Sequence, residues 1–448
     1  MSYGERTRVS RELFEKAKKH IPGGSAYSIR YFEPYPFYVN RAEGSRIWDV
    51  DGNEYIDFWM VHFAAILGHG YKPVINAVRE QLDYGAHFGW CNEWEVKWAE
   101  AVCRWFNMDM AKPANSGTEA NMYAVRLARA YTGRRKIGKM EGGWHGGYDG
   151  LHKAVNYPYD KPSSLGLASV ENIVPLPFND LEATIRIVEK EDLAGIILEP
   201  VLGSAGVIPA SEDYLKGLRE FCSRRSIVLI FDEVITGFRH PGGMQNYFKV
   251  KPDIITIGKT AGGQYFAGAG GICGDREIMS LLDQLNRPEF WSRSFHGGTY
   301  VGNALTMRAG YVTISELEKR SDEIYPYVNS LAEYGRKRIR EILEETGFEA
   351  YVTGLLSMFG LHFTKERPVN GLTAERTKNR ELGRKLFYHM LQKGIAYLRP
   401  ETPHFAVSTA HKKDEVERLA NELEDFIKNQ IGSNFYSSAN YSSSIPTS

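Results

Sequence analysis

Short continuous runs of hydrophobic residues recur in the middle of the chain, at positions 195–199, 227–231 and 253–257. Between the first two runs, residues 212–225 carry apolar side chains at helical spacing. Continuous apolar strands that alternate with helices are typical of a parallel sheet that is buried on both faces. The pattern therefore predicts an α/β fold built around such a sheet.

Weaker patterns on the N-terminal side predict further elements. Helical spacing occurs at 10–20, with Ser10 as the expected N-cap, and again at 72–82 and 93–107. Alternating positions predict short strands at 38–50 and 54–58, joined by a turn at Asp51-Gly52-Asn53.

Beyond residue 310 the pattern changes to long charged helices at 316–345 and 376–393, with a short strand near 357–363. This change predicts a division into domains. We expect an N-terminal segment at 1–54 that contributes to a small domain, a large domain at 55–310, a C-terminal part of the small domain at 311–431, and a disordered tail at 432–448.

Composition limits the classes of partner. The 448 residues correspond to roughly three domains, or to two with one enlarged. Lys+Arg and Asp+Glu number 55 each, so no positive excess remains to neutralise the phosphates of a nucleic acid. No apolar run approaches the ~20 residues of a membrane helix, and the charged N-terminus is unlike a secretory signal, so we expect no membrane association and a cytoplasmic location. The four cysteines lack CxxC spacing, which argues against a disulfide framework and a cysteine metal site.

The first motif with chemical meaning is the stretch 115–120, Asn-Ser-Gly-Thr-Glu-Ala, which leads into a helical pattern. Small and hydroxyl residues at a helix start expose backbone N–H groups to which a phosphate can bind. The same residues also form a capping box, because Ser116 is followed three positions later by Glu119. The motif alone leaves both interpretations open.

Two further motifs come directly after expected strands. Asp232 follows the run 227–231, where an acid can bind a metal, pair with a cation or cap a loop. Lys259 follows the run 253–257 in a glycine-rich stretch that lacks the spacing of a Walker A loop. A lysine at this position is either a surface residue or, if it is removed from water, a nucleophile with a lowered pKa. In a parallel sheet, ligands bind at the carboxyl ends of the strands.

One cofactor explains all three motifs together. A phosphate site, a buried carboxylate and a lysine able to form a Schiff base are the parts that hold pyridoxal 5'-phosphate. Asp232 would keep the pyridine nitrogen protonated, and Lys259 would bind the aldehyde and later move the α-proton. We expect no metal in this site.

These motifs resemble those of a known family. The segments 115–120, 141–146, 198–200, 232–239, 258–259 and 297–303 occur in the order found in class III aminotransferases. Within that family, segments 22–24, 67–70, 131–134 and 357–360 are similar to the glutamate-1-semialdehyde aminomutase branch, and the resemblance spans roughly residues 21–411. It implies the pyridoxal-phosphate-dependent transferase fold type I, with a mainly parallel central sheet in the large domain and a smaller α+β domain built from the C-terminal and N-terminal segments.

The resemblance also implies roles for individual residues. Lys259 and Asp232 would be catalytic, Asp232 by binding the pyridine nitrogen. The other cofactor contacts would be Ser116, Gly117 and Thr118 at the phosphate, Val234 and Trp144 on the two faces of the ring, His145 beside Trp144, and Glu199 near the cofactor. Thr299 would reach the phosphate of the neighbouring subunit's cofactor, which implies a homodimer with shared sites.

The segments expected to bind substrate depart from the mutase branch. After 22–24 the chain retains Arg30 as a candidate for gripping a substrate carboxylate but adds the bulky Tyr27. Arg399 is a second candidate for the carboxylate, and Trp59 belongs to an aromatic stretch that would form a substrate wall. The glutamate that the mutase branch carries shortly before its C-terminal Ala-His is not in register here.

We therefore expect an aminotransferase that moves an amino group from an amino acid or amine donor to a keto or aldehyde acceptor by a ping-pong mechanism. The alternative is glutamate-1-semialdehyde 2,1-aminomutase, in which one molecule is both donor and acceptor, and an amino-acid racemase is a third candidate. A nucleotide-binding dehydrogenase would need a GxGxxG turn after a first strand, which is missing. A non-catalytic protein would leave the complete cofactor set unexplained.

Overall fold

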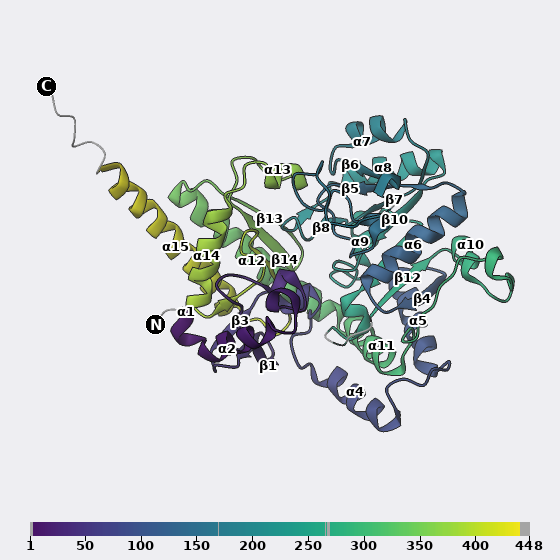
Figure 1. The fold of residues 1–448 in the computed structure, drawn as a ribbon, viewed down its shortest axis with the longest axis horizontal. Helices are drawn as coiled ribbons and strands as arrows, with labels where there is room; N and C mark the ends of the chain where they lie inside the picture. Colours follow the sequence, from purple (N-terminus) through teal and green to yellow (C-terminus); the bar gives the residue numbers. More distant parts are fainter. Residues whose placement is uncertain (1–2, 169, 265, 267–268, 440–448) are drawn as a thin grey trace.

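The computed structural model describes residues 3–168, 170–264, 266 and 269–439, with side chains up to residue 431. A seven-stranded sheet forms the centre of its larger part (Figure 1). The strands lie in the order β4-β12-β11-β10-β7-β5-β6, and only β12 runs antiparallel to its neighbours. The expected α/β fold with a mainly parallel sheet is therefore confirmed. The strands are β4 (Met110–Ala114), β5 (Lys136–Met140), β6 (Ile173–Leu176), β7 (Leu193–Leu198), β10 (Val228–Asp232), β11 (Ile254–Gly258) and β12 (Gly270–Gly274).

Alternate residues of one strand pack into different hydrophobic cores on the two faces of the sheet. On β7, Ile196 and Leu198 belong to the core that contains Leu215 of α8 (Glu212–Arg225). Ile197, between them, belongs to the core that contains Ala124 of α6 (Gly117–Thr132). Every residue of β7 is buried, which explains why this strand is a continuous apolar run instead of an alternating one.

The helices expected at 72–82, 93–107 and 212–225 are present as α4 (Lys72–Tyr84), α5 (Glu93–Phe106) and α8. Asn92 starts α5 by accepting hydrogen bonds from the N–H groups of Trp94 and Glu95. The remaining helices around this sheet are α7 (Leu181–Val188), α9 (Gly243–Phe248), α10 (Arg276–Met279) and α11 (Ala304–Lys319). Short 3₁₀ helices are η1 (Pro22–Gly24), η2 (Ser28–Arg30), η3 (Asp149–Leu151), η4 (Val170–Asn172), η5 (Lys259–Gly262), η6 (Ser280–Leu282) and η7 (Phe290–Ser292).

Segments from both ends of the chain lie side by side at the other end of the molecule, where Figure 1 shows the purple N-terminal elements next to the yellow-green C-terminal ones. One sheet there joins β1 (Val39–Glu43), β2 (Arg46–Asp49) and β3 (Glu54–Asp57) to β15 (Ile395–Ala396). Another has the order β13-β14-β16, with β13 (Tyr351–Leu355), β14 (Met358–His362) and β16 (His404–Ala406), and a two-stranded sheet pairs β8 (Val201–Leu202) with β9 (Ile208–Pro209). The helices of this part are α1 (Tyr3–Arg6), α2 (Arg8–Ala17), α3 (Met60–Phe63), α12 (Ser321–Thr346), α13 (Gly371–Glu375), α14 (Arg380–Gln392) and α15 (Lys413–Ala439). The exact domain boundaries at 54, 310 and 431 stay a prediction.

The expected N-cap of the first long helix is wrong. Ser10 lies inside α2, and its hydroxyl donates to Asp51 Oδ2 at 2.7 Å. The same carboxylate accepts the N–H groups of Val9 and Ser10 at 2.6 and 2.9 Å, so an acid far away in the sequence satisfies the helix start. Local sequence patterns cannot identify a cap that tertiary structure supplies.

Three other boundaries differ from the expectation. The stretch 38–50 forms two strands, β1 and β2, and the helix expected at 316–345 is the end of α11 followed by α12, with a break at Arg320. The tail expected at 432–448 begins within α15, which continues to Ala439, and residues 440–448 lie outside the described part of the chain. Within the described residues, no helix is both long and apolar enough to span a bilayer.

Candidate active site

Most of the residues expected in the site follow strands at the carboxyl edge of the seven-stranded sheet. Because β4, β5, β7, β10 and β11 point the same way, their carboxyl ends meet at this edge. Ser116, Gly117 and Thr118 follow β4, Trp144 and His145 follow β5, Glu199 follows β7, Asp232 ends β10 with Val234 just beyond, and Lys259 follows β11.

Asp232 is buried and held by three hydrogen bonds. Its Oδ2 accepts from Asn121 Nδ2 and from His145 Nδ1, each at 2.7 Å, and its Oδ1 accepts the N–H of Val234 at 3.0 Å. Thr256 donates its hydroxyl to Asn121 Oδ1 at 2.6 Å, which turns the amide nitrogen of Asn121 toward Asp232. This network fixes the carboxylate in one orientation. Sequence analysis missed Asn121, although an asparagine on the buried face of a helix requires a polar partner.

Glu199 and Lys259 share the site with Asp232. Glu199 accepts the N–H of Trp144 at 2.9 Å and the N–H of Gly203 at 3.1 Å. Burial and the nearby charge of Asp232 raise the pKa of Glu199 to about 7. Burial lowers the pKa of the Lys259 ammonium, against the opposing effects of Asp232 and Glu199. Lys259 is therefore not an ordinary surface lysine, and its amine is closer to the neutral form that acts as a nucleophile.

Both interpretations of the stretch 115–120 hold. Ser116 caps α6 by accepting the N–H of Glu119 at 3.2 Å, while the N–H groups of the first helical turn have no partner within the helix. Two glycines allow close packing around this turn. A Cβ on Gly146 would lie 2.1 Å from Thr118 Oγ1, and a Cβ on Gly117 would lie 2.8 Å from Val234 Cγ2. The result is a close-packed cradle at the helix start that suits a phosphate.

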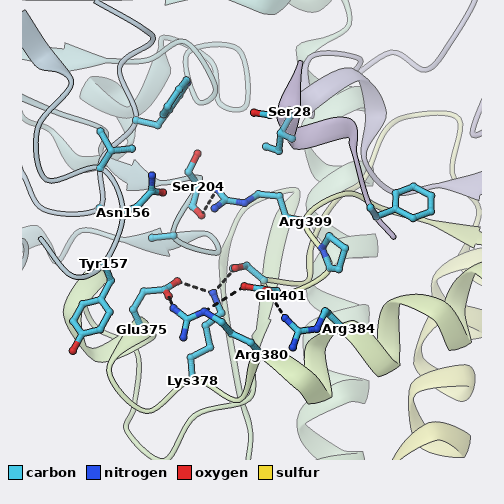
Figure 2. A pocket seen from close by; sticks show the side chains of 18 of the residues that line it. Ser28, Asn156, Tyr157, Ser204, Glu375, Lys378, Arg380, Arg384, Arg399 and Glu401 are labelled. Carbon is cyan, nitrogen blue, oxygen red and sulfur yellow. Dashed lines mark hydrogen bonds and ion pairs between the residues drawn. The ribbon is translucent and has the colours of Figure 1, made fainter. Parts of the chain in front are cut away.

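A cavity of about 910 Å³ adjoins the site through Trp144 and is also lined by Tyr27. Figure 2 shows Arg399 on the wall of this cavity. Arg399 Nη1 donates to the Ser204 carbonyl at 2.9 Å. No carboxylate among the described residues lies within ion-pair distance of Arg399, and burial lowers the pKa of its guanidinium. Other cations on the same wall are all paired: Lys378 and Arg380 each lie 2.6 Å from Glu375, and both Arg380 and Arg384 contact Glu401.

The remaining substrate candidates occupy different places. Tyr27 lines the cavity, and the guanidinium of the exposed Arg30 lies over its ring at 5.9 Å. Trp59 is half-buried and packs edge-on against His404, with ring centroids 5.0 Å apart, and is not part of the cavity wall. Thr299 is exposed in the stretch after η7, and its neighbour Gly298 lies against Asn115, which directly precedes the predicted phosphate residues.

The turn α3 has an unusual backbone. Residues 60–63 have φ values of 43°, 56°, 55° and 69°, a left-handed conformation that costs non-glycine residues roughly 1–2 kcal/mol each. Three contacts hold the turn in place: Asp57 Oδ1 accepts the N–H groups of Trp59 and Met60 at 2.8 and 3.1 Å, Thr260 donates its hydroxyl to the Ala64 carbonyl at 2.8 Å, and Arg239 donates to the Phe63 carbonyl. Strain of this kind, held by neighbouring groups, is typical of functional sites. Sequence analysis missed it because the stretch 60–63 contains no glycine to indicate a left-handed turn.

Glu233, next to Asp232, gives a prediction for stability. It is buried, it accepts the N–H of Met244 at 2.8 Å, and burial raises its pKa from 4.5 to about 7. The folded protein therefore binds this proton more tightly than the unfolded chain, so the contribution to stability is complete below pH 4.5 and is lost as the pH rises through about 7. We expect the melting temperature of the wild type to fall more between pH 5 and 8 than that of Glu233→Gln. The exposed Glu220→Gln should follow the wild type, and parallel curves for all three proteins would contradict the prediction.

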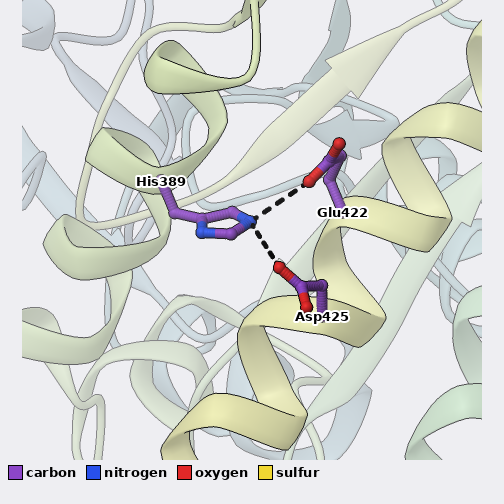
Figure 3. A group of neighbouring side chains, drawn as sticks. All are labelled: His389, Glu422 and Asp425. Atoms are coloured by element: carbon purple, nitrogen blue, oxygen red, sulfur yellow. Dashed lines mark ion pairs between the residues drawn. The ribbon is translucent and has the colours of Figure 1, made fainter. Parts of the chain in front are cut away.

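A second group of ligand-type side chains lies far from this edge, between α14 and α15. His389 Nε2 is 3.5 Å from Glu422 and 4.0 Å from Asp425 (Figure 3). The ammonium of Lys393 is 2.9 Å from Glu422 and 3.7 Å from Asp425. The chain's own cation thus neutralises the acids, and the group is an ion-pair cluster.

Comparisons with known proteins extend over almost the whole chain. The family model Aminotransferase class-III matches residues 27–427. A glutamate-1-semialdehyde 2,1-aminomutase from Archaeoglobus fulgidus is 39% identical over 423 residues, which cover 93% of this chain and 98% of the relative. An omega-transaminase from Sphaerobacter thermophilus superposes with a TM-score of 0.86 at 32% identity, covering 94% and 97% of the two chains. A glutamate-1-semialdehyde-aminomutase from Pseudomonas aeruginosa gives a TM-score of 0.86 at 25% identity, covering 95% of each chain.

Proposed function

This chain belongs to the class-III aminotransferase family, and on that premise we propose that it moves an amino group on a small substrate that carries a carboxylate. One observation carries the proposal. Arg399 presents a guanidinium to the cavity with no carboxylate partner among the described residues, whereas the other cations on that wall are paired. A planar guanidinium of this kind binds a carboxylate through two parallel hydrogen bonds.

Pyridoxal 5'-phosphate is the cofactor of this family, and the chain has the family's fold type I. The residues at the sheet edge fit the cofactor. His145 Nε2 is buried without a hydrogen-bond partner, and the N–H groups at the start of α6 suit a phosphate. We assign the phosphate to Ser116, Gly117 and Thr118, the pyridine nitrogen to Asp232, the ring faces to Trp144 and Val234, and the aldehyde to Lys259. When bound, the cofactor supplies an electron sink for a carbanion at the substrate α-carbon.

The chain's own residues supply binding and proton transfer. Three donors hold the oxygens of Asp232 in place, and its carboxylate would accept a hydrogen bond from a protonated pyridine nitrogen. The amine of Lys259, with its lowered pKa, takes the α-proton and returns it to a neighbouring carbon. Arg399 holds the substrate carboxylate, so that the α-carbon faces Lys259.

Among the reactions of this family, the comparisons favour glutamate-1-semialdehyde 2,1-aminomutase over the two-substrate aminotransferase that sequence analysis preferred. Curated relatives with identities between 37% and 39% bear the aminomutase name, and they match this chain over nearly their entire lengths. In that reaction the amino group moves from carbon 2 to carbon 1 of a single molecule. We therefore take the aminomutase as the first candidate.

A two-substrate transaminase is the second candidate, favoured by a departure of the sequence from the mutase branch. The stretch before the C-terminal Ala-His carries no glutamate in the register of the mutase branch and contains His404 instead. Burial, together with the positive charge of Arg399, lowers the pKa of His404 to about 3, so that this side chain is neutral. The likeness to an omega-transaminase at 32% identity supports the same candidate.

One experiment separates the two candidates. The holoenzyme is incubated with glutamate-1-semialdehyde alone and, separately, with amino donors before any acceptor is added. An aminomutase converts the semialdehyde to its isomer with the amino group on carbon 1 and needs no second substrate. A transaminase instead releases one equivalent of keto product from a donor and stops until an acceptor arrives. If neither sample changes, the proposal of amino-group transfer is wrong.

We also propose a homodimer in which Thr299 serves the neighbouring site. Large aromatic side chains are exposed near Thr299 and in the loop before α5, with Trp291 and Trp90 both 85% exposed. Exposed apolar clusters of this size are typical of protein interfaces. We propose that a second copy of the chain covers them. The expected cytoplasmic location remains a prediction.

A hybrid dimer tests the shared site. Lys259→Ala and Thr299→Ala variants are prepared separately, and each is expected to have low activity. If Thr299 acts across the interface, a mixed dimer contains one site with both native residues, because the intact lysine and the intact threonine come from different subunits. Mixing the two variants under conditions in which subunits exchange should then give hybrid dimers with up to about half of the activity of the wild-type dimer. Threonine acting within its own subunit would give no rescue.

A further inference from the structure

We propose that His62 contacts the substrate, and that the left-handed turn α3 holds its imidazole at the wall of the active site between Tyr27 and the Lys259 segment. The inference rests on the proposed amino-group transfer and adds a specificity-determining residue to it. Neither the sequence motifs nor the family comparisons assign a role to this histidine.

The position of the ring carries the inference. The imidazole of His62 stacks on Tyr27, with centroids 5.8 Å apart and an interplanar angle of 20°, and Tyr27 lines the cavity. The edge of Trp59 supports it from another direction, with centroids 4.9 Å apart. The hydrogen bond from Thr260 to the Ala64 carbonyl, 2.8 Å long, ties the end of the turn to the residue directly after Lys259. The turn is therefore tied to the segment that carries Lys259.

The backbone conformation shows that surrounding contacts impose this placement of the ring. His62 and its neighbours on either side all have positive φ values, and Val61, a β-branched residue, is especially unfavourable in that region. Asp57 and Arg239 clamp the two ends of the turn through backbone groups. Met60 and Phe63 are buried in the core, whereas His62 is only half-buried and lies close enough to Lys259 to be influenced by its charge.

The ring nitrogens of His62 do not stabilise the described part of the fold through hydrogen bonds. Within the described part of the chain, neither ring nitrogen has a hydrogen bond. The unused donor and acceptor are therefore available to a ligand.

The charges around His62 favour the neutral form of its imidazole. Burial, with the positive charges of Lys259 and Arg30, lowers its pKa to about 4, while Asp57 acts in the opposite direction. Tyr27 is the other titratable group packed on the ring. A neutral imidazole offers one N–H donor and one acceptor without adding a positive charge next to Lys259. We assign the N–H to an oxygen of the substrate near the reacting carbon.

Substrate binding without turnover tests the assignment. In the cofactor-loaded Lys259→Ala protein, the Kd of glutamate-1-semialdehyde and of the amino donors is measured by calorimetry with His62 intact, with His62→Phe and with His62→Asn. Phenylalanine keeps an aromatic ring but has no nitrogen. Asparagine tolerates the left-handed backbone and keeps both a donor and an acceptor. We expect the Kd to rise at least about tenfold with phenylalanine and less than about threefold with asparagine.

The outcomes separate this inference from the proposed function. Tight binding with His62 intact and equally tight binding with phenylalanine would overturn the role of His62 while leaving amino-group transfer untouched. No binding of any of these compounds with His62 intact would overturn the proposed function and the inference with it. The exposed His20→Phe serves as the control and should bind like the parent protein. If the phenylalanine variant fails to fold, weak binding by a folded asparagine variant also contradicts the assignment.

Discussion

Replacing Lys259 by alanine is expected to give a folded protein that has lost at least about four orders of magnitude in kcat. The amine of Lys259 is the group with a lowered pKa at the end of β11, beside Asp232 and Glu199. Without it, no other amine is assigned to hold the cofactor aldehyde or to move the α-proton. Turnover, the absorption spectrum of the cofactor and the melting temperature are measured on the same preparation.

The matched control is Lys249→Ala. Lys249 also has a left-handed backbone, with φ of 55° against 50° for Lys259, but it is exposed at the end of α9. Both variants replace a lysine by alanine at a positive φ, so any loss of stability caused by the backbone conformation cancels in the comparison. If Lys259→Ala kept more than a few per cent of wild-type turnover, or if Lys249→Ala lost as much, the catalytic assignment of Lys259 would be wrong.

Much of the fold could be predicted because burial on both faces leaves a simple signal. The strands β7, β10 and β11 are continuous apolar runs, and α8 occupies the residues expected for it. The antiparallel β12 was not expected. Its sequence, Gly-Gly-Ile-Cys-Gly, has little apolar surface, because Ser116 and Trp98 pack so closely on it that Cβ atoms at Gly270 and Gly271 would lie 2.3 and 2.5 Å from them. A strand rich in glycines that allow close packing lacks the apolar run by which a strand is predicted.

The candidate site was likewise predictable from the sequence only in part. Asp232 and Lys259 could be found because each directly follows an apolar strand, and the topology of a parallel sheet then brings them together. Asn121 and His62 could not be found from patterns. The role of Asn121 depends on contacts with Thr256 and Asp232, which come from other strands, and the position of His62 depends on a backbone conformation that tertiary clamps impose.

Replacing Arg399 by alanine is expected to lower kcat/KM by roughly 100-fold, mostly through KM. A bidentate contact between a guanidinium and a carboxylate provides two charge-assisted hydrogen bonds, and losing them costs about 3 kcal/mol. Arg399→Lys should recover only part of this, because an ammonium keeps the charge but not the planar pair of donors. Kinetics with a carboxylate substrate and with the matching amine that lacks the carboxylate provide the measurement.

The amine that lacks the carboxylate makes this prediction specific. If Arg399 recognises the carboxylate, the variant should lose little activity toward that amine, and the difference between the two substrates should almost disappear. Arg384→Ala is the control on the same cavity wall, since Arg384 is already paired with Glu401 and should affect both substrates equally and weakly. Equal losses on both substrates for Arg399→Ala would mean that this arginine supports the cavity wall through the Ser204 carbonyl. Carboxylate binding would then fall to Arg30, whose exposed guanidinium lies over the ring of Tyr27.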